Sequence, residues 1–541
     1  MRVIIVGAGI GGLSTYLALK KHLVNSDSNI SLTILESKLT PPKFQSGSIA
    51  GSAIAFPPNG LRALASFSPI ALAHVQSHAF TMASNVTFRS SSGKALGTMN
   101  FGSAERYGYG TSMLPRVVLH NALLKEVNDM DIRWGVKVTS IREVETGEGG
   151  ILVECEGGDI EQADLVIGAD GVHSVVKDHV FKDKYQTEFG YALCIMRATS
   201  TYCIFRGQAG IGGFLPTSSL PPALRTALQS EGIAMTFGRN GLFGYANASP
   251  LDVYTKSDFS KHIHEPFIMW WSFYDSDNIP DEDNPPFDEI KAILLKKHGD
   301  WVSPHDEKQP ADEKSRTQSQ SVFRAIIETA FQPESHSSSI PTKPVVVPRF
   351  ITPRLPVFSN ASPEISSPRN RGRLVLIGDA AHTMTPDIGH GASCAVEDAV
   401  VYSLLLKHYI SPQSDVFSIS GTSTAEKIEL LSSNRISKAL EATAKAYESV
   451  RRPRVNSLTS SKKCNIPMKE MNTFYEWFRD MAIWMLCRFS CSPWLSKNNP
   501  LFFCLAKCPE SVYDPMFAYD AEAVVANYLA EKEVGTAGRC S

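Results

Sequence analysis

Three glycines near the amino terminus have the types and spacing of a phosphate-binding loop. Gly7, Gly9 and Gly12 follow the β-branched run RVIIV and open an apolar stretch with helical periodicity. Gly7 allows the tight turn, Gly9 lets a pyrophosphate approach the backbone, and Gly12 allows close helix packing. Glu36 ends the next apolar run, where a carboxylate accepts hydrogen bonds from ribose hydroxyls. The pattern predicts a site for FAD or NAD, and disfavours the 2′-phosphate of NADP.

Two later apolar runs also lead into glycine loops that carry carboxylates. Asp170 and Gly171 follow the run at 164–167, and Gly378 and Asp379 follow the run at 374–377. For each loop taken alone, a structural turn is the alternative interpretation. Together with the first loop, they could be three strand ends that serve one site.

The order and spacing of the three loops resemble the class A flavoprotein monooxygenases, the group of p-hydroxybenzoate and salicylate hydroxylases, and especially its fungal biosynthetic members. The resemblance covers roughly residues 1–255 and 370–460. It implies a non-covalently bound FAD whose ribityl chain and pyrophosphate lie at Asp379. It also implies that the loop at Asp170 serves both FAD and the nicotinamide cofactor, and that a helix opening near Ala392 faces the isoalloxazine ring.

Two shorter motifs extend the resemblance, and three positions depart from it, one of them Ser393, where asparagine is common. Gly51 begins a segment similar to the strand and helix that follow the acidic residue in the family, and Arg116 begins an Arg-x-x-Leu-His helix whose arginine contacts the flavin. Lys177 stands where the family usually has arginine, so it lacks the planar fork that would strengthen binding of the nicotinamide cofactor. His390 stands where glutamine is common; it is a proton-donor candidate, with a polar loop residue as the alternative.

The resemblance implies an FAD-dependent monooxygenase of secondary metabolism. In the family, NAD(P)H binds transiently and reduces FAD, and reduced FAD reacts with O2 to form a C4a-hydroperoxide. One oxygen atom then enters a small aromatic or polycyclic substrate, by hydroxylation or by epoxidation. A flavin-dependent halogenase, a dehydrogenase and a non-catalytic flavin-binding protein are the alternatives, although the Trp-x-Trp-x-Ile-Pro signature of the halogenases is absent.

The substrate side is expected in the β-rich region that follows Lys177. Arg206, in a Phe-Arg-Gly strand, would hold an anionic or phenolate substrate. Tyr245, on a neighbouring strand, would donate or relay a proton, with simple packing as the alternative. Trp270 and Trp271 are expected on opposite faces of the sheet, and the pattern does not decide which of them faces the pocket.

The predicted fold class is α/β, with a doubly wound Rossmann-like FAD-binding domain, an inserted β-sheet substrate domain and a helical C-terminal region. We expect the FAD domain to comprise residues 1–180 and 371–460, the substrate domain 181–370 and the helical tail 461–541. The composition of 303–370, rich in proline, serine and charge, predicts long surface loops. The arginines of 447–454 are interpreted as structural, tying a helix end to the core.

Composition narrows the functional class. The 541 residues are 43% hydrophobic and 20% charged with a net charge of −2, which favours a globular protein without a nucleic-acid partner. The ten cysteines contain no CxxC pair, so no metal site is predicted. Without a recognisable leader or an apolar helix of about 18 residues, we expect a cytoplasmic protein. The aromatic tail is expected to cap the flavin domain, with a membrane-surface or dimer contact as the alternative; the oligomeric state stays open.

Overall fold

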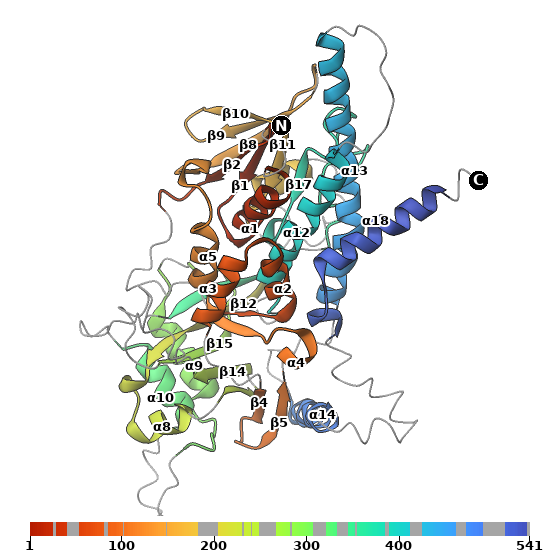
Figure 1. Ribbon diagram of the computed structural model, residues 1–541. Coiled ribbons are helices and arrows are strands. Elements are labelled where there is room, and N and C mark those ends of the chain that lie inside the picture. Colours follow the sequence, from red (N-terminus) through yellow and green to blue (C-terminus); the bar gives the residue numbers. More distant parts are fainter. Residues whose placement is uncertain are drawn as a thin grey trace, which may run out of the picture.

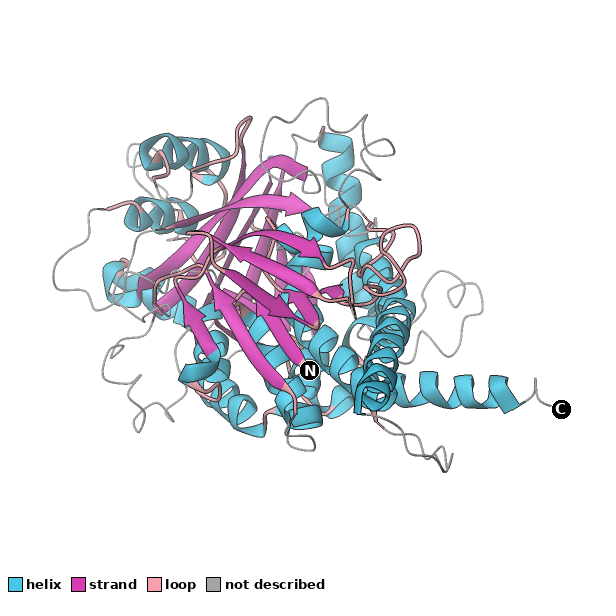
Figure 2. Ribbon diagram, turned by 90° about the horizontal axis from the view of Figure 1, so that it is seen from above, coloured by secondary structure: helices cyan, strands magenta, loops and turns pink. Residues whose placement is uncertain are grey.

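The computed structural model of the chain describes most of the 541 residues. The exceptions are residues 25–28, 41–52, 80–84, 101, 148, 182–203, 230–231, 240, 248–266, 282–283, 307–320, 333–343, 352–353, 385–388, 412–424, 461–471, 491–513 and 538–541. Figure 2 shows the strands gathered in the middle of the molecule with helices around them. The predicted α/β fold, with its flavin-binding unit, second sheet and helical C-terminal region, is confirmed.

A five-stranded parallel sheet forms the centre of the first unit, which is expected to bind the flavin and is called the flavin unit below. Its strands, in spatial order, are β17 (Leu374–Leu376), β11 (Leu165–Gly168), β1 (Arg2–Val6), β2 (Ser31–Glu36) and β7 (Ile132–Trp134). All four residues of β11 and the last four of β1 are buried, because helices cover both faces of a parallel sheet. Strands β1, β11 and β17 are neighbours, so their carboxyl ends deliver the three glycine loops to one edge.

Helices pack around this sheet and complete the unit. Helix α1 packs against α12, and α12 in turn packs against α2 and α13 (Figure 1). The helices are α1 (Ile10–Leu19), α2 (Pro58–Phe67), α3 (Pro69–His78), α4 (Ala104–Tyr107), α5 (Arg116–Leu124), α6 (Val175–Val180), α11 (Asp379–His382), α12 (Gly391–Ile410) and α13 (Ala425–Ser460). Two small antiparallel sheets flank them, one of β8 (Val138–Glu143), β9 (Ile151–Cys155) and β10 (Ile160–Ala163), the other of β3 (Ala53–Phe56) and β6 (Ser112–Pro115).

A seven-stranded sheet forms the second unit. Its order is β16 (Val345–Ile351), β12 (Ile204–Pro216), β15 (Phe267–Asp275), β14 (Gly241–Asn247), β13 (Ile233–Gly238), β4 (Asn85–Ser90) and β5 (Ala95–Asn100). On one face, buried side chains of the sheet form a core with those of α8 (Pro222–Gln229), α9 (Phe287–His298) and α10 (Val322–Ala330). These three helices lie in the lower part of Figure 1. The other face is free of these helices and carries a separate apolar cluster.

The structure differs from the sequence prediction in the segments that build the second sheet and in the region 303–370. Strands β4 and β5 come from 85–100, inside the segment assigned to the flavin domain, because β4 pairs in parallel with β13. The region 303–370 is also more ordered than its composition suggested, since it contains α10 and β16. Helix α10 has an Ser321 cap on its first turn and buries six of its nine residues. In addition, Phe358 and Ala361 belong to the core of the flavin unit.

The C-terminal helices contact two different parts of the molecule. Helix α18 (Ala521–Ala537) contacts α12, α13 and α2 of the flavin unit, as the tail was expected to do. Helix α14 (Thr473–Ser490) instead packs on β5 at the end of the seven-stranded sheet. Among the described residues, no helix has both the length and the apolar character needed to cross a membrane.

Candidate active site

The glycines of the first loop serve two different purposes. Two of them allow close packing, and the third leaves space open towards a cavity. A Cβ added to Gly12 would lie 1.9 Å from the carbonyl oxygen of Gly7, and one added to Gly7 would lie 2.6 Å from the oxygen of Ala169. These two positions therefore allow the loop, the helix and the neighbouring strand to pack. A Cβ on Gly9, in contrast, would meet no atom within 4 Å, because this residue borders an open cavity.

The cavity has a volume of about 1070 Å³ and lies between the two sheets. At one end it is lined by the glycine loops and the carboxylates that follow them. Among the predicted cofactor residues, those that line it are Gly7, Gly9, Glu36, Arg116, Asp170, Asp379 and Ala392. The structure thus brings together seven of the nine predicted cofactor residues. Of the other two, Gly12 packs against the backbone of the loop, and Gly51 lies outside the described residues.

Glu36 is held in place by backbone donors. One of its oxygens accepts a hydrogen bond from the N–H of Ala8 at 2.8 Å, and the other accepts from Lys38 at 2.9 Å. These bonds fix the carboxylate at the end of β2, one strand away from the first glycine loop. In this position it can accept hydrogen bonds from a pair of ribose hydroxyls.

Asp170 presents a buried oxygen to the cavity. Its Oδ2 accepts a hydrogen bond from the N–H of Val175 at 2.8 Å, at the start of α6. Its Oδ1 accepts none from the part of the chain that the structure describes. Burial raises the pKa of this carboxyl, although hydrogen bonds from the helix start oppose the shift. Such an unpaired buried acceptor is able to accept a hydrogen bond from a bound molecule or from water.

Arg116 and His120 connect the next helix to the first loop. Arg116 is the first residue of α5 and is exposed to the cavity. One turn later, the Nε2–H of His120 donates to the carbonyl of Ala8 at 2.7 Å. Burial lowers the pKa of His120, so the neutral ring is favoured at this bond. The helix is therefore anchored to the glycine loop, and its first arginine lies at the cavity edge.

The third loop leads directly into the amino end of α12. The N–H of Gly378, with a φ of 62°, donates to Asp398 at 2.9 Å, and Asp379 follows it at the cavity wall. Gly391 and Ala392, the first residues of the 20-residue helix α12, line the same wall. The unpaired N–H groups at a helix start favour negative charge in front of them.

Taken together, the polar end of the cavity fits FAD. It combines an open backbone approach at Gly9, a fixed carboxylate at Glu36, an unsatisfied buried acceptor at Asp170 and the positive end of α12. These are the groups that a pyrophosphate, a ribose, a ribityl chain and an electron-rich ring need.

Comparisons with known proteins agree with this site. A family model described as an FAD binding domain matches residues 358–415. The chain is 25% identical over 417 residues to the FAD-dependent monooxygenase paxM of Penicillium paxilli, covering 75% of this chain and 69% of that protein. HpxO of Klebsiella pneumoniae, solved with FAD and uric acid, shares the fold with a TM-score of 0.59 at 19% identity, covering 90% of this chain and 93% of that one. A salicylate hydroxylase substrate complex gives a TM-score of 0.57 at 18% identity, with 98% of both chains covered.

Its FAD binding domain and its relatives in sequence identify the chain as an FAD-dependent monooxygenase. The expected family is therefore confirmed, and the function as a flavin monooxygenase with it. The likeness of the solved structures concerns the fold, whereas the relatives in sequence carry the activity in their names.

The other end of the cavity in this monooxygenase is almost entirely apolar. Strands alternate their side chains between two faces, and the face opposite α8, α9 and α10 carries Leu242, Trp271 and Phe273. Further lining side chains from the same sheet are Val86, Phe88, Phe214, Ile233, Met235, Phe237, Met269, Val345 and Val347. Trp271 is therefore the tryptophan whose side chain lies on the cavity face, whereas that of Trp270 is buried in the cluster on the opposite face.

The structure does not bring Tyr245 to the cavity, which corrects its expected role. Tyr245 pairs across the strands with Trp270 and points to the helix-covered face, where its ring lies 6.3 Å from that of Phe323. The alternation of the strand decides this, because neighbouring Gly244 takes the cavity face. The backbone of Arg206 belongs to β12, but its side chain lies outside the described residues.

Two of the positions that depart from the family pattern, Lys177 and His390, have different environments. Lys177 is buried on α6, where its Nζ donates to the carbonyl of Val172 at 2.8 Å, and it is not among the residues that line the cavity. His390 caps the start of α12, is 4% exposed and lines the cavity. Of these two residues, His390 is therefore the one that a molecule bound in the cavity can contact.

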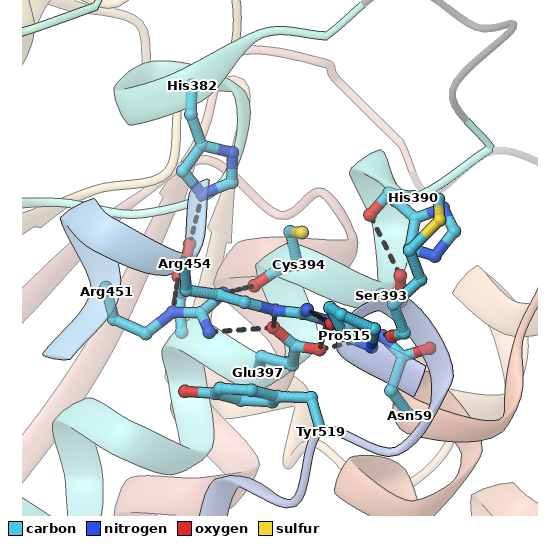
Figure 3. A network of polar contacts seen from close by, with 12 residues as sticks. Asn59, His382, His390, Ser393, Cys394, Glu397, Arg451, Arg454, Pro515 and Tyr519 are labelled. Carbon is cyan, nitrogen blue, oxygen red and sulfur yellow. Dashed lines mark hydrogen bonds and ion pairs between the residues drawn. The ribbon is translucent and has the colours of Figure 1, made fainter. Parts of the chain in front are cut away.

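A buried ionic network holds α12 in place. Arg451 donates to Glu397 and Asp398, both at 2.7 Å, and Arg454 donates to Glu397 at 3.0 Å (Figure 3). Burial alone would raise the pKa of Glu397, but the two arginines outweigh it and hold the pKa below its ordinary value. The Nε2 of His382 adds a bond of 2.6 Å to Asp398. The predicted structural role of the arginines is confirmed.

Sequence reasoning missed two parts of the site. Met516 and Phe517, from the segment before α18, line the cavity although the tail lay outside the resemblance. No local signal marks them, because neither residue type nor spacing distinguishes them from other apolar residues of the tail. The face of the sheet that forms the substrate half was also not predicted, since strand alternation gives two faces without saying which is covered.

Proposed function

We propose that this monooxygenase inserts one atom of O2 into an apolar aromatic or polycyclic small molecule, with NAD(P)H as the electron donor. The observation that carries the proposal is the composition of the single cavity described above, which joins an FAD-type polar end to an apolar wall from the second sheet. The reaction is a hydroxylation or an epoxidation, because both place one oxygen atom on a carbon framework. Specialised metabolism is the setting that the fungal relatives support.

The residues of the polar end would hold the flavin. Glu36 would bind the ribose of the adenosine half, the N–H groups behind Gly9 the pyrophosphate, and Asp379 the ribityl chain. Asp170 would accept a hydrogen bond from the cofactor at its open oxygen. Bound FAD supplies the transfer of electrons from NAD(P)H and the activation of O2.

The residues of the apolar end would bind and shield the substrate. Trp271, Phe273 and Met235 present flat or flexible apolar surfaces, which stack on or pack against ring systems. The same surfaces keep water away from the reacting atoms. HpxO of Klebsiella pneumoniae was solved with uric acid, a polar ring; the apolar wall of the present chain supports a less polar substrate.

Arg206 stays part of the proposal as the group that would bind an anionic or phenolate oxygen. Its position in the fold supports this role, because Arg206 belongs to β12 and residues 210–214 of the same strand line the cavity. Within described side chains of the substrate wall, apolar groups prevail, so a single cation would orient the substrate strongly.

The test is an oxygenation assay on the full chain loaded with FAD. The flavin spectrum establishes binding, and oxidation of NADPH and of NADH is then followed with a panel of phenols, naphthols, indoles and polyenes. We expect the panel member that fits to accelerate cofactor oxidation and to gain one oxygen atom by mass spectrometry. A yellow protein that oxidises neither cofactor with any substrate would instead be a flavin-binding protein without this activity. Halogenated product would identify a halogenase.

A further inference from the structure

The segment Asp514–Asp520, here named the C-terminal strap, contacts parts of the flavin unit that are distant from it in sequence. It precedes α18 and contributes Met516 and Phe517 to the cavity wall. All other residues that line the cavity come before residue 400 in the sequence. The strap, more than a hundred residues later, therefore completes the cavity wall. Such a segment needs strong anchors, because ordering a chain costs about 1–2 kcal/mol per residue.

Arginines of the flavin unit anchor both ends of the strap. At its start, Arg106 forms a two-bond contact with Asp514, at 2.9 and 2.7 Å, and the hydroxyl of Tyr107 donates to the same carboxylate at 2.9 Å. At its end, Arg62 donates to the carbonyl of Tyr519 at 2.9 Å. The planar guanidinium suits these paired acceptors, so each anchor restricts direction as well as distance.

The buried network of α12 anchors the middle of the strap. Arg454 donates to the carbonyls of Pro515 and Met516 as well as to Glu397, and its guanidinium lies 4.3 Å from the ring centre of Tyr519 (Figure 3). Glu397 belongs to the second turn of α12, whose start lines the flavin end of the cavity. The strap is therefore connected by one arginine to the helix that faces the cofactor site.

Phe517 is the side chain that these anchors place against the site. It is 4% exposed, and its ring lies 5.7 Å from the ring of His390, nearly parallel to it, and 5.6 Å from that of Tyr107. His390 caps α12 and lines the cavity together with Phe517. Figure 3 shows His390 beside the start of this helix, next to Ser393.

We propose that the C-terminal strap is a wall of the FAD site and that Phe517 is a positioning residue, which holds the His390 ring against the amino end of α12 and shields the bound flavin from water. The inference rests on the proposed function only in taking the cavity as the FAD site. It assigns an active-site role to a segment that the sequence placed in a capping tail. It also explains why four arginine and tyrosine side chains converge on seven residues.

The test compares Phe517→Ala and Phe517→Leu with the unaltered full chain. FAD is titrated into the apoprotein, and the fluorescence of the bound flavin is quenched with acrylamide. We expect Phe517→Ala to bind FAD about tenfold more weakly and to show stronger quenching, and Phe517→Leu, which keeps bulk without the flat ring, to fall between. Phe474→Ala, which removes a 66% exposed ring from α14, is the matched control and should change neither quantity.

Unchanged FAD affinity and unchanged quenching in folded Phe517→Ala would overturn the proposal. If that variant does not fold, as judged by circular dichroism, Phe517→Leu decides by the same two quantities. Asp514→Asn adds an independent arm: it weakens the anchor to Arg106 without altering the cavity lining, so quenching should rise while thermal unfolding stays close to that of the unaltered protein. Absence of NAD(P)H oxidation would count against the proposed function alone, because none of these readouts needs turnover.

Discussion

The two ends of the cavity are built on different principles. At the flavin end, three parallel strands stop at the same edge, and the groups offered to the ligand are backbone N–H groups, carboxylates and a helix start. At the substrate end, a sheet that is antiparallel apart from one parallel pair offers side chains from one of its faces, and those side chains are apolar. The first surface recognises a fixed cofactor, and the second selects by size and shape.

The difference predicts that the flavin end tolerates few substitutions and the substrate end many. A backbone turn accepts few residue types, so loops such as the one at Gly7 and Gly12 have little freedom. A sheet face keeps its fold with many apolar residues as long as volume is preserved. Substrate range can therefore change through the second sheet without loss of FAD binding.

Removing the cation from the buried network should give the largest effect on stability. Arg451→Met leaves Glu397 and Asp398 without their shared fully buried partner, and the loss of one member of such a network costs about 3–5 kcal/mol. We expect urea unfolding to show this loss, together with weaker FAD binding through displaced α12. Asp300→Asn, in an exposed pair with Arg324 on the second unit, should cost less than about 1 kcal/mol. Equal losses in the two variants would contradict the assignment.

Gly9→Ala should separate cofactor binding from folding. The backbone at Gly9 has a φ of −74°, which alanine adopts freely, and the added Cβ meets no protein atom. The methyl group would occupy the space of the pyrophosphate, so FAD should bind roughly a hundredfold more weakly while unfolding stays unchanged. The contrast is Gly12→Ala, whose Cβ meets a backbone oxygen at 1.9 Å and should destabilise the fold itself. FAD titration and thermal unfolding of both variants measure the difference.

The flavin end was predictable from sequence because its determinants are local. Gly7 follows one strand and Glu36 ends the next within a short βαβ unit, and Asp170 and Asp379 come after strands of their own, so composition and order suffice. The arrangement of three neighbouring strand ends then follows from the parallel sheet.

The substrate end and the strap were not predictable because their determinants are distant. Tyr245 and Trp271 occupy neighbouring strands, yet the face each takes depends on helices α9 and α10, which come later in the chain. Strand β4 joins the second sheet across more than a hundred residues. Phe517 is held at the site by a segment that binds arginines of three earlier helices, α2, α4 and α13. Sequence patterns of short period contain none of this information.

Acidification should weaken the second unit through His298. Burial, aided by the charge of Lys297, lowers the pKa of this histidine to about 3, and its Nε2 lies 2.9 Å from the hydroxyl of Ser272. The folded protein therefore binds fewer protons than the unfolded chain. The contribution of His298 to the free energy of unfolding is fully present above pH 6.5 and is lost as the pH decreases from 6.5 towards 3. At pH 5 this histidine should cost about 2 kcal/mol.

Urea unfolding at pH 7 and pH 5 measures the loss of stability that we assign to His298, and the variant His298→Gln serves as the comparison. Glutamine keeps a hydrogen-bonding group near Ser272 but does not titrate, so its stability should decrease by about 2 kcal/mol less between the two pH values. The same decrease in both proteins would show that other groups cause the acid sensitivity. His22 and His74 in the flavin unit, whose pKa values burial lowers to about 4, should contribute equally to both proteins.

Gly244→Ala should give the smallest effect and the most selective one. A Cβ at this position would lie 2.1 Å from the indole ring of Trp271, so the ring must move within the substrate wall. We expect the KM of the substrate found in the oxygenation panel to rise about tenfold, and the affinity for FAD to stay unchanged, because the strain lies on the second sheet. Thr87→Ser, at the outer part of the same sheet, should alter neither constant. If the KM stayed constant while FAD binding weakened, the two ends of the cavity would not be independent, and the division of roles between backbone and side chains would fail.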